Sequence, residues 1–455
     1  MTLGVRRAAV LLACYAWLFA PAIGAAQGVS IRDHFERARD FDPTYRAAVA
    51  GRDVAKRATE AARSMLGPKV SLSGSLFRTN RVEESRNFLG QPVDISRRFD
   101  TQNATVQARQ PIYRKRESLG VDQALAQESA AENILYFAEQ DLQVRLVSAW
   151  LEVLAARTLV STFSDSYLAA QEYLAEVDRR RQGGEATVQD LEQARARVVQ
   201  AEALLEDAKA RLMSADQALS LIVGPDQKIP SGISMAFFRS LQIPLKSQTE
   251  VVEKIERSNY EILSARFQEE AAKLERDKAR SDRLPTADAF ASVTKGQNDS
   301  LSFIKDEQRL GIQVSVPLYT HGAIDASIAQ AEANYRKLQA QTQAVMFRVR
   351  NEALTAFNNL RVLEIRLKAA DRIAEAAATV LKSQQLGLKA GVSSRGEIAQ
   401  SMTEMLAAHR ERVMVRREYA FAWLKLQAAS GILDFNLLET LQGQLIAAPQ
   451  LTERR

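Results

Sequence analysis

The same set of landmarks occurs twice in this chain, at positions about 207 residues apart. The matched landmarks are prolines and tyrosines that end alternating stretches, and glycines that flank apolar-striped stretches: Pro111 and Tyr113 with Pro317 and Tyr319, Gly184 with Gly391, and Gly224 with Gly431. A duplication on this scale predicts a quasi-symmetric molecule whose two halves lie side by side.

The N-terminus predicts export from the cytoplasm. Arg6 and Arg7 precede an apolar run over residues 8–20, and small residues follow as far as Ala26. This is the order of a secretory signal peptide, so we expect residues 1–26 to be removed. An alternative is lipidation of Cys14, which follows a Leu-Leu-Ala box. Cys14 is the only cysteine in the sequence, so we expect no disulfide in the mature chain.

The composition is typical of a helical rod and gives no sign of a nucleic-acid partner. A formal net charge of +6 arises from 61 basic and 55 acidic residues. These residues are interspersed, as on a solvated helix surface, and they form no basic block. Beyond the signal no apolar run approaches about 18 residues, so we expect no transmembrane helix.

Long helical hairpins are predicted in both halves. Residues 114–182 contain no proline, and a continuous helix of this extent would reach about 100 Å. Gly183 and Gly184 then supply a break, and a second helix runs to Val223 before Gly224 and Pro225 end it. In the second half we expect helices over 323–386 and 397–429, joined by a turn within 387–396.

The return helix of the first half carries a heptad pattern. Apolar residues recur at alternating spacings of three and four, and alanine occupies every second position: Leu191, Ala194, Val198, Ala201, Leu205, Ala208, Leu212, Ala215, Leu219 and Ile222. Such a seam predicts lengthwise packing against another helix, as in a coiled coil. The corresponding seam of the second half is less regular and includes three methionines, which act more often as packing residues than as ligands.

Four segments alternate with period two, which predicts strands of about 8–10 residues, long enough to cross hydrocarbon when tilted. They form two hairpins, at about 69–110 and 285–317, with polar loops at 79–98 and 295–307. One face is small and apolar and the other is rich in hydroxyls. A half-buried soluble sheet has the same period. Open edges cannot face lipid, so a membrane-inserted sheet requires several protomers.

The duplicated order of strand hairpin, long helix, glycine turn and heptad helix resembles the TolC family of outer membrane channel proteins over nearly all of the mature sequence. Asp42-Pro43-Thr44-Tyr45 and its echo Asn259-Tyr260-Glu261-Ile262 add to the resemblance. It implies a mostly α fold with β: a trimeric outer membrane β-barrel of four strands per protomer, continued by a periplasmic α-helical barrel of coiled-coil hairpins.

The expected boundaries follow from this duplicated plan. They are a first repeat over 27–224 with its helical hairpin at about 113–224, an equatorial linker over 225–256, a second repeat over 257–431 with its helical hairpin at about 320–430, and an equatorial tail over 432–455. Pro111, Tyr113, Pro317 and Tyr319 would mark the transitions from strand to helix.

The resemblance also implies partners. These are two further copies of the chain, a periplasmic adaptor (membrane fusion protein), an inner membrane ABC transporter or RND pump, and outer membrane lipid. The Asp-Pro-Thr-Tyr opening and the form of the signal favour the type I secretion branch, with its CyaE-like channels for RTX-type toxins. The alternative within the family is multidrug efflux. An alternative from another class is a periplasmic coiled-coil adaptor, which would have one hairpin rather than two.

Candidate gate residues lie at the helical hairpin tips, near Gly183, Gly184 and Gly391. In the family, an acidic pair after the second turn surrounds the periplasmic mouth and binds cations. The matching residues are Glu397 and Gln400, with Asp190 and Gln193 as first-half counterparts and with Arg395 and the arginines at 179–181 as possible ion-pair partners. The competing interpretation is that the two acids only stabilise helix N-termini.

Nothing in the sequence indicates catalysis, a cofactor or a metal site. The three histidines, His34, His321 and His409, are far apart and have no metal-ligand spacing, so each is expected at the surface or at an interface. There is no nucleophile motif and no phosphate-binding glycine loop. We therefore expect a transport protein rather than an enzyme.

Overall fold

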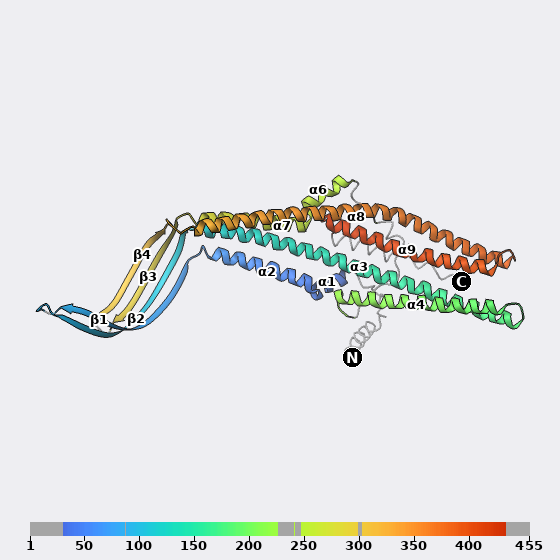
Figure 1. The fold of residues 1–455 in the computed structure, drawn as a ribbon, viewed down its shortest axis with the longest axis horizontal. Helices are drawn as coiled ribbons and strands as arrows, with labels where there is room; N and C mark the ends of the chain where they lie inside the picture. Colours follow the sequence, from blue (N-terminus) through green and yellow to red (C-terminus); the bar gives the residue numbers. More distant parts are fainter. Residues whose placement is uncertain (1–30, 87, 226–240, 242–246, 299–302, 434–455) are drawn as a thin grey trace, which may run out of the picture.

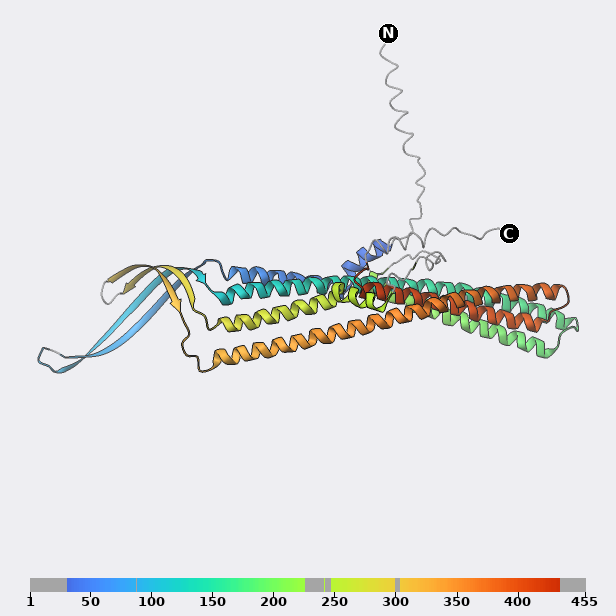
Figure 2. The same ribbon diagram turned by 90° about the horizontal axis from the view of Figure 1, so that it is seen from above.

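The computed structural model describes residues 31–86, 88–225, 241, 247–298 and 303–433. These residues form an elongated molecule with a sheet at one end and long helices leading away from it (Figure 1). In the perpendicular view the helices still run along the same long axis (Figure 2).

The order of elements is the same in both halves. The first half contains α1 (Ile31–Phe41), α2 (Pro43–Ser64), β1 (Lys69–Arg86), β2 (Pro92–Tyr113), α3 (Lys115–Gln182) and α4 (Val188–Val223). The second half contains α6 (Gln248–Ser258), α7 (Tyr260–Ser281), β3 (Thr286–Asn298), β4 (Phe303–Ser315), α8 (Ala323–Lys389) and α9 (Arg395–Ala429). The predicted duplication is confirmed.

Equivalent residues of the two halves share one hydrophobic core. Trp150 of α3 and its counterpart Phe357 of α8 are both buried in the same cluster. Leu219 of α4 and Leu426 of α9, again equivalent, lie in that cluster too. The two halves therefore form one folded unit, because their long helices bury their apolar faces against one another in a shared core.

The four strands form one antiparallel sheet in the order β1-β2-β3-β4. Val106 of β2 is opposite Leu72 of β1 on one side and Val293 of β3 on the other. The pairing of β2 with β3 joins the two halves, and it leaves β1 and β4 as the edges of the sheet within the described residues.

The strands are longer than the sequence pattern predicted. β1 and β2 have 18 and 22 residues, and β3 and β4 have 13 each, against an expectation of about 8–10. The polar stretch expected as a loop at 79–98 is mostly paired, since Thr79 is opposite Phe99 and Arg86 is opposite Pro92. Backbone hydrogen bonds continue the ladder where the apolar alternation fades, which side-chain periodicity cannot reveal.

The turn of the second helical hairpin is shorter than expected. α8 continues to Lys389 and α9 begins at Arg395, so Gly387 and Gly396 lie inside helices rather than in the turn. The chain reverses after Ala390, with Gly391 at φ +77°. A glycine within a terminal turn costs only about 1 kcal/mol relative to alanine, so these two did not end their helices.

The heptad seam of α4 is confirmed. Every seam residue is buried or half-buried against neighbouring helices. At the tip Leu191 and Ala194 pack with Val177 of α3, and midway Leu205 and Ala208 pack with Leu159 and Phe163 of α3. The small alanines allow the two helix backbones to approach closely, as the alternation with leucine predicted.

The repeated tetrapeptides prove to be helix starts, which the sequence analysis did not assign. Asp42 caps α2 by accepting a hydrogen bond from the Tyr45 backbone N–H at 2.8 Å, and Pro43 opens the helix. Asn259 caps α7 through bonds from the Glu261 and Ile262 backbone N–H groups at 3.0 and 3.1 Å. The helices that precede each strand hairpin were therefore missed, although their caps were recognised as an echo.

One stretch of α3 is more apolar than the sequence analysis allowed. It contains an 18-residue window with a mean hydropathy of 1.3, and 56% of that window is buried inside the molecule. The burial is typical of a core helix, because α3 packs against α2, α4, α7 and α9.

Three of the predicted segments lie largely outside the described residues. These are the signal over 1–26, most of the equatorial linker over 225–256, and the tail over 432–455 apart from its first two residues. Within the linker, α6 runs through the boundary that was placed at residues 256–257, since its hydrogen bonding continues to Ser258.

Candidate functional site

Exposed apolar side chains alternate along the edge strands of the sheet. On β1 they are Val70, Leu72 and Leu76, and on β4 they are Leu310, Ile312 and Val314. Leu72 is 75% exposed and Leu310 is 88% exposed, although both lie in regular, fully paired strands. A regular sheet that presents such a face has the pattern of strands whose outer surface contacts lipid.

A compact ion-pair network joins the sheet to the long helices. Arg114, between β2 and α3, donates from its guanidinium to both carboxylate oxygens of Asp288 in β3, at 2.8 and 2.6 Å. It also donates to Glu117 in the first turn of α3 at 2.9 Å. The Asp288 side chain is only 10% exposed, and Arg109 approaches it at 4.0 Å. A nearly buried carboxylate held by a bidentate arginine fixes the orientation of the helix relative to the sheet.

The four predicted transition residues lie at the helix-side end of the sheet. Pro111 is opposite Asp288, and the register shifts between Pro111 and Tyr113, which indicates a β-bulge. Pro317 and Tyr319 follow the end of β4 in an exposed connection that leads to α8. The Tyr319 hydroxyl lies 3.0 Å from Nδ1 of His321. Both chain segments therefore leave the sheet at this end.

At the first helical tip, Asp190 completes the N-terminal cap of α4. Gly183 ends α3 and Gly184 adopts a φ of +78°. The Asp190 carboxylate accepts hydrogen bonds from the Thr187 backbone N–H at 2.9 Å and from its hydroxyl at 2.7 Å. These bonds, with the charge of Arg180, hold the pKa of the Asp190 carboxyl below its ordinary value. The Gln193 side chain, one turn further on, is exposed.

The second tip repeats this arrangement. Ser394 caps α9, and the Glu397 carboxylate accepts a hydrogen bond from the Ser394 backbone N–H at 3.0 Å. Gln400, which matches the second acid of the family pattern, is exposed and donates to Glu404 at 2.8 Å. An acid, Glu404, therefore lies one helical turn beyond that position. Arg395 is the first residue of α9. Each of the two candidate acids is thus part of a capping box, which was not recognised from the sequence. An acid in the first turn that stabilises the helix N-terminus agrees with the competing interpretation.

The arginines near the first tip contact acids other than Asp190. Arg181 lies 3.5 Å from Asp178, and Arg180 lies 3.6 Å from Glu185. Arg180 acts on Asp190 through its charge, without a direct ion pair among the described contacts. The sequence placed these groups near one another but did not indicate which carboxylate each arginine contacts.

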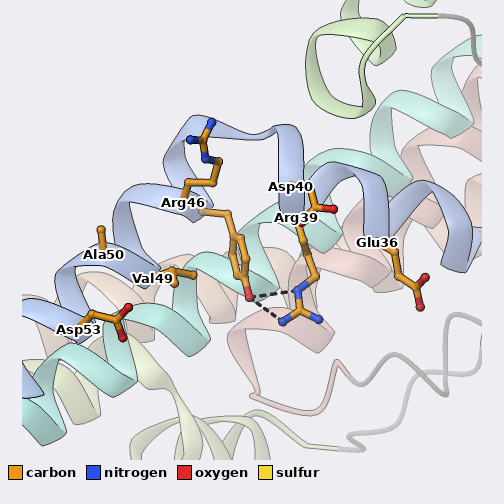
Figure 3. A pocket seen from close by; sticks show the side chains of 8 residues that line it. Glu36, Arg39, Asp40, Arg46, Val49, Ala50 and Asp53 are labelled. Atoms are coloured by element: carbon orange, nitrogen blue, oxygen red, sulfur yellow. Dashed lines mark hydrogen bonds between the residues drawn. The ribbon is translucent and has the colours of Figure 1, made fainter.

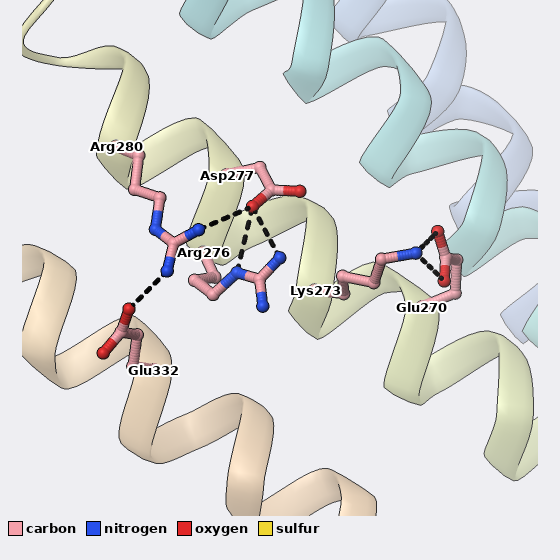
Figure 4. A network of polar contacts seen from close by, with 6 residues as sticks. All are labelled: Glu270, Lys273, Arg276, Asp277, Arg280 and Glu332. Atoms are coloured by element: carbon pink, nitrogen blue, oxygen red, sulfur yellow. Dashed lines mark hydrogen bonds and ion pairs between the residues drawn. The ribbon is translucent and has the colours of Figure 1, made fainter.

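Further ion pairs hold the long helices together. Arg417 of α9 donates to Glu152 of α3 at 2.6 Å, which joins the two helical hairpins. Arg280 of α7 donates to Glu332 of α8 at 2.6 Å and also lies 3.9 Å from Asp277, which pairs with Arg276 (Figure 4). Lys273 and Glu270 form a separate pair on α7. Sequence reasoning missed the pairs of Arg417 with Glu152 and of Arg280 with Glu332, because the members of each pair lie on different helices and show no local signal.

The bend between α1 and α2 is also fixed by polar contacts. The Arg39 guanidinium donates to the Tyr45 hydroxyl at 3.1 and 2.9 Å, beside a cavity of about 580 Å³ (Figure 3). On the neighbouring helix α3, Arg145 donates to both oxygens of the Asp42 carboxylate at 2.7 and 3.2 Å. The hydrogen bonds from Arg145, reinforced by the Tyr45 backbone N–H, lower the pKa of the Asp42 carboxyl.

The described residues contain no group of three His, Cys, Asp or Glu side chains that could hold a metal ion. The expectation that all three histidines lie at a surface or interface is wrong for His34, which is fully buried in α1. His409 of α9 is half-buried, and burial together with the charges of Arg412 and Arg416 lowers its pKa. His321 is exposed beside Tyr319.

Several known proteins resemble this chain over most of its length. The protease secretion protein PrtF of Dickeya chrysanthemi is 26% identical, and the alignment covers 99% of this chain and 97% of PrtF. The outer membrane protein TolC of Vibrio cholerae is 23% identical over 89% of this chain and 91% of that protein. The crystal structure of the outer membrane protein VceC from Vibrio cholerae superposes with a TM-score of 0.72 at 18% identity, over 88% of this chain and 96% of VceC.

The family model of the outer membrane efflux proteins matches residues 35–225 and 251–432. These two ranges correspond to the two structural halves, and together they include every strand and the long helical hairpins. The duplicated fold, the apolar sheet face and this match agree, and the chain belongs to the outer membrane efflux protein family.

Proposed function

We propose that this chain forms, as a homotrimer, an outer membrane channel continued by a periplasmic helical tunnel. The observation that carries the proposal is the sheet, whose apolar face is exposed and whose edges are β1 and β4 among the described residues. Backbone groups at an open edge cannot face lipid unsatisfied. Three copies that pair β1 of one with β4 of the next would close a barrel of about twelve strands.

The cargo in this proposal is a protein, exported by the type I route. The similarity to PrtF, named as a protease secretion protein, extends over nearly the full length of both chains and supports this route. The channel would receive its cargo from an inner membrane ABC transporter through a periplasmic adaptor. An adaptor role for the chain itself fits poorly, because an isolated coiled-coil hairpin needs no lipid-facing sheet.

The acids at the helical tips are proposed to line the periplasmic mouth. Asp190 and Glu397 lie in equivalent caps at the starts of α4 and α9. Figure 1 shows that the two helical hairpins containing α4 and α9 turn at the end of the molecule opposite to the sheet. Their capping bonds use one oxygen each, and both side chains are exposed. The remaining carboxylate oxygen of each is therefore positioned to bind a cation in the mouth while the cap is retained.

The export route is tested by comparing a strain that lacks this chain with its parent. Loss of one or more secreted proteins with unchanged drug sensitivity supports type I secretion. Drug hypersensitivity with an unchanged set of secreted proteins would instead assign the chain to an RND-type efflux pump. A chain found as a soluble periplasmic product, with no heat-modifiable trimer in outer membrane fractions, would overturn the channel itself.

The orientation of the sheet has its own test, with neighbouring residues as matched variants. Leu72→Arg places a charge on the apolar face, where it should cost about 2–4 kcal/mol if that face contacts lipid. Ser73→Arg places the same charge on the opposite face of the same strand. We expect only Leu72→Arg to lower the yield of heat-modifiable trimer in the outer membrane. Equal tolerance of both variants would contradict a lipid-facing surface.

A further inference from the structure

A cavity of about 580 Å³ lies between the two helical hairpins of one chain, toward their tips. Its walls come from all four long helices, with Phe163 and Tyr173 on α3, Leu204 on α4, Leu381 on α8 and Met402 on α9. Figure 1 shows that both hairpins run to the same end of the molecule. This volume is within the range of roughly 300–1,000 Å³ that is usual for small-molecule pockets.

The wall of the cavity is largely apolar. Phe163 and Leu381 are buried at its base, and partly exposed leucine, isoleucine and methionine side chains complete the surface. Large side chains of the two hairpins surround this space without filling it. An apolar body that enters it removes both its own surface and that of the wall from water, which favours binding.

The charged lining residues of the cavity favour an anion. Arg197 of α4 and Arg410 of α9 lie on opposite hairpins, and neither forms an ion pair with a carboxylate among the described residues. The Arg197 guanidinium is held 5.6 Å from the centroid of the Tyr173 ring. Glu176 is the acidic side chain among the described lining residues, so the two arginines leave a net positive charge.

We propose that this cavity binds a small amphiphile that has an apolar body and one anionic group. The body would occupy the space between Phe163, Leu381 and Met402, and the anionic group would contact Arg197 and Arg410. Such a ligand bridges the two hairpins near the tips, whereas the ion pair between Arg417 and Glu152 bridges them without any ligand. This binding site goes beyond the export role and does not depend on it.

The proposal is tested with two probes that differ by one charge. These are 1-anilinonaphthalene-8-sulfonate and its neutral analogue N-phenyl-1-naphthylamine, which lacks the sulfonate. Equilibrium binding is measured on the full chain, assembled in lipid nanodiscs, and the signal of empty nanodiscs is subtracted. We expect one saturable site per chain, with tighter binding of the sulfonate.

Two variants separate charge from shape. Arg197→Gln with Arg410→Gln should weaken sulfonate binding by about tenfold, the usual effect of losing a charge-assisted contact, and leave the neutral probe unchanged. Met402→Trp places a bulkier ring where the apolar body would lie, so it should weaken saturable binding of both probes. Arg195→Gln is the matched control, because Arg195 is exposed on α4, pairs with Glu192 at 2.7 Å and does not line the cavity.

The same measurements can overturn the site. Sulfonate affinity that is equal in the wild-type chain and in the double arginine variant would show that the arginines hold no anion. Affinities of both probes that are unchanged by Met402→Trp would place the probes elsewhere. Absence of saturable binding to the wild-type chain would show that the cavity is closed in the assembled protein.

Discussion

The Arg114 guanidinium binds both carboxylate oxygens of Asp288 across a separation of 174 residues, at the point where the sheet meets the helices. Arg114 belongs to the first half of the chain and Asp288 to the second. The pair therefore connects the two halves where the chain passes from sheet to helix, and the contact of Arg114 with Glu117 extends this connection into α3.

Removing one member of this pair should destabilise the protein strongly. Asp288→Leu leaves the Arg114 charge without its main partner in a site that is largely screened from water, at a cost of about 3 kcal/mol. We expect a clear fall in the temperature at which the trimer dissociates on heating. Arg114→Met combined with Asp288→Leu and Glu117→Gln should cost less than Asp288→Leu alone, since none of these three charges is then left without its partner. A triple variant as unstable as the single one would contradict this account.

The capping role and the gating role of the tip acids Asp190 and Glu397 can be tested separately. Asp190→Asn with Glu397→Gln keeps oxygen acceptors for both caps but removes the charges. If these acids bind cations at the mouth, the divalent concentration that half-blocks conductance in planar bilayers should rise by about fivefold or more, because affinity depends on the number of charged ligands. The control is Glu404→Gln, two turns beyond Glu397 on α9. An unchanged block in the double variant would leave the acids with a capping role alone.

Asp42 should make the stability of the molecule depend on acidity. Its folded pKa lies below the ordinary value because of the hydrogen bonds from Arg145, so its contribution is complete at pH values above about 4. This contribution is lost as the pH falls from about 4 through the depressed folded pKa, since protonation weakens the contact with Arg145. Asp42→Asn retains a cap acceptor without the charge, so its apparent melting temperature should fall less steeply with acidification below pH 4. Identical pH profiles for the two proteins would contradict this role.

Two glycines with similar backbone angles should differ in their tolerance of alanine. At Gly431, with φ +64°, an added Cβ would lie 2.4 Å from the Ser258 backbone oxygen, whereas at Gly391, with φ +77°, it would meet open space. Gly391→Ala should cost about 1 kcal/mol from left-handed strain alone. Gly431→Ala adds a backbone collision and should cost about 3 kcal/mol. Thermal dissociation of the trimer measures both, and equal losses would show that the backbone at Ser258 gives way to the added Cβ without cost.

Much of the secondary structure was accessible from local sequence pattern. The long helices followed from the absence of proline and from the heptad seam at Leu191 to Ile222, and the strand hairpins followed from alternation. The predictions failed where the local signal fades. Paired strands continue through polar residues between Thr79 and Arg98, and α8 and α9 continue through Gly387 and Gly396.

The candidate site was predictable only in part, for the same reason. Sequence reasoning singled out Glu397 through the family resemblance and Asp190 as its counterpart in the first half, and it did not recognise the capping boxes to which both belong. It did not find Arg114 with Asp288, Arg417 with Glu152 or the cavity at Arg197 and Arg410, because each requires side chains from separate elements.

The sequence by itself determined the duplication and the type of each long element. These features depend on residues within a few positions of one another, through backbone hydrogen bonding and the period of side-chain burial. Only the tertiary structure decided that β2 pairs with β3, that Trp150 and Phe357 share one core, and that Arg114 binds Asp288. Such contacts depend on the path of the whole chain and on strand register, which set the distance between residues that are remote in sequence.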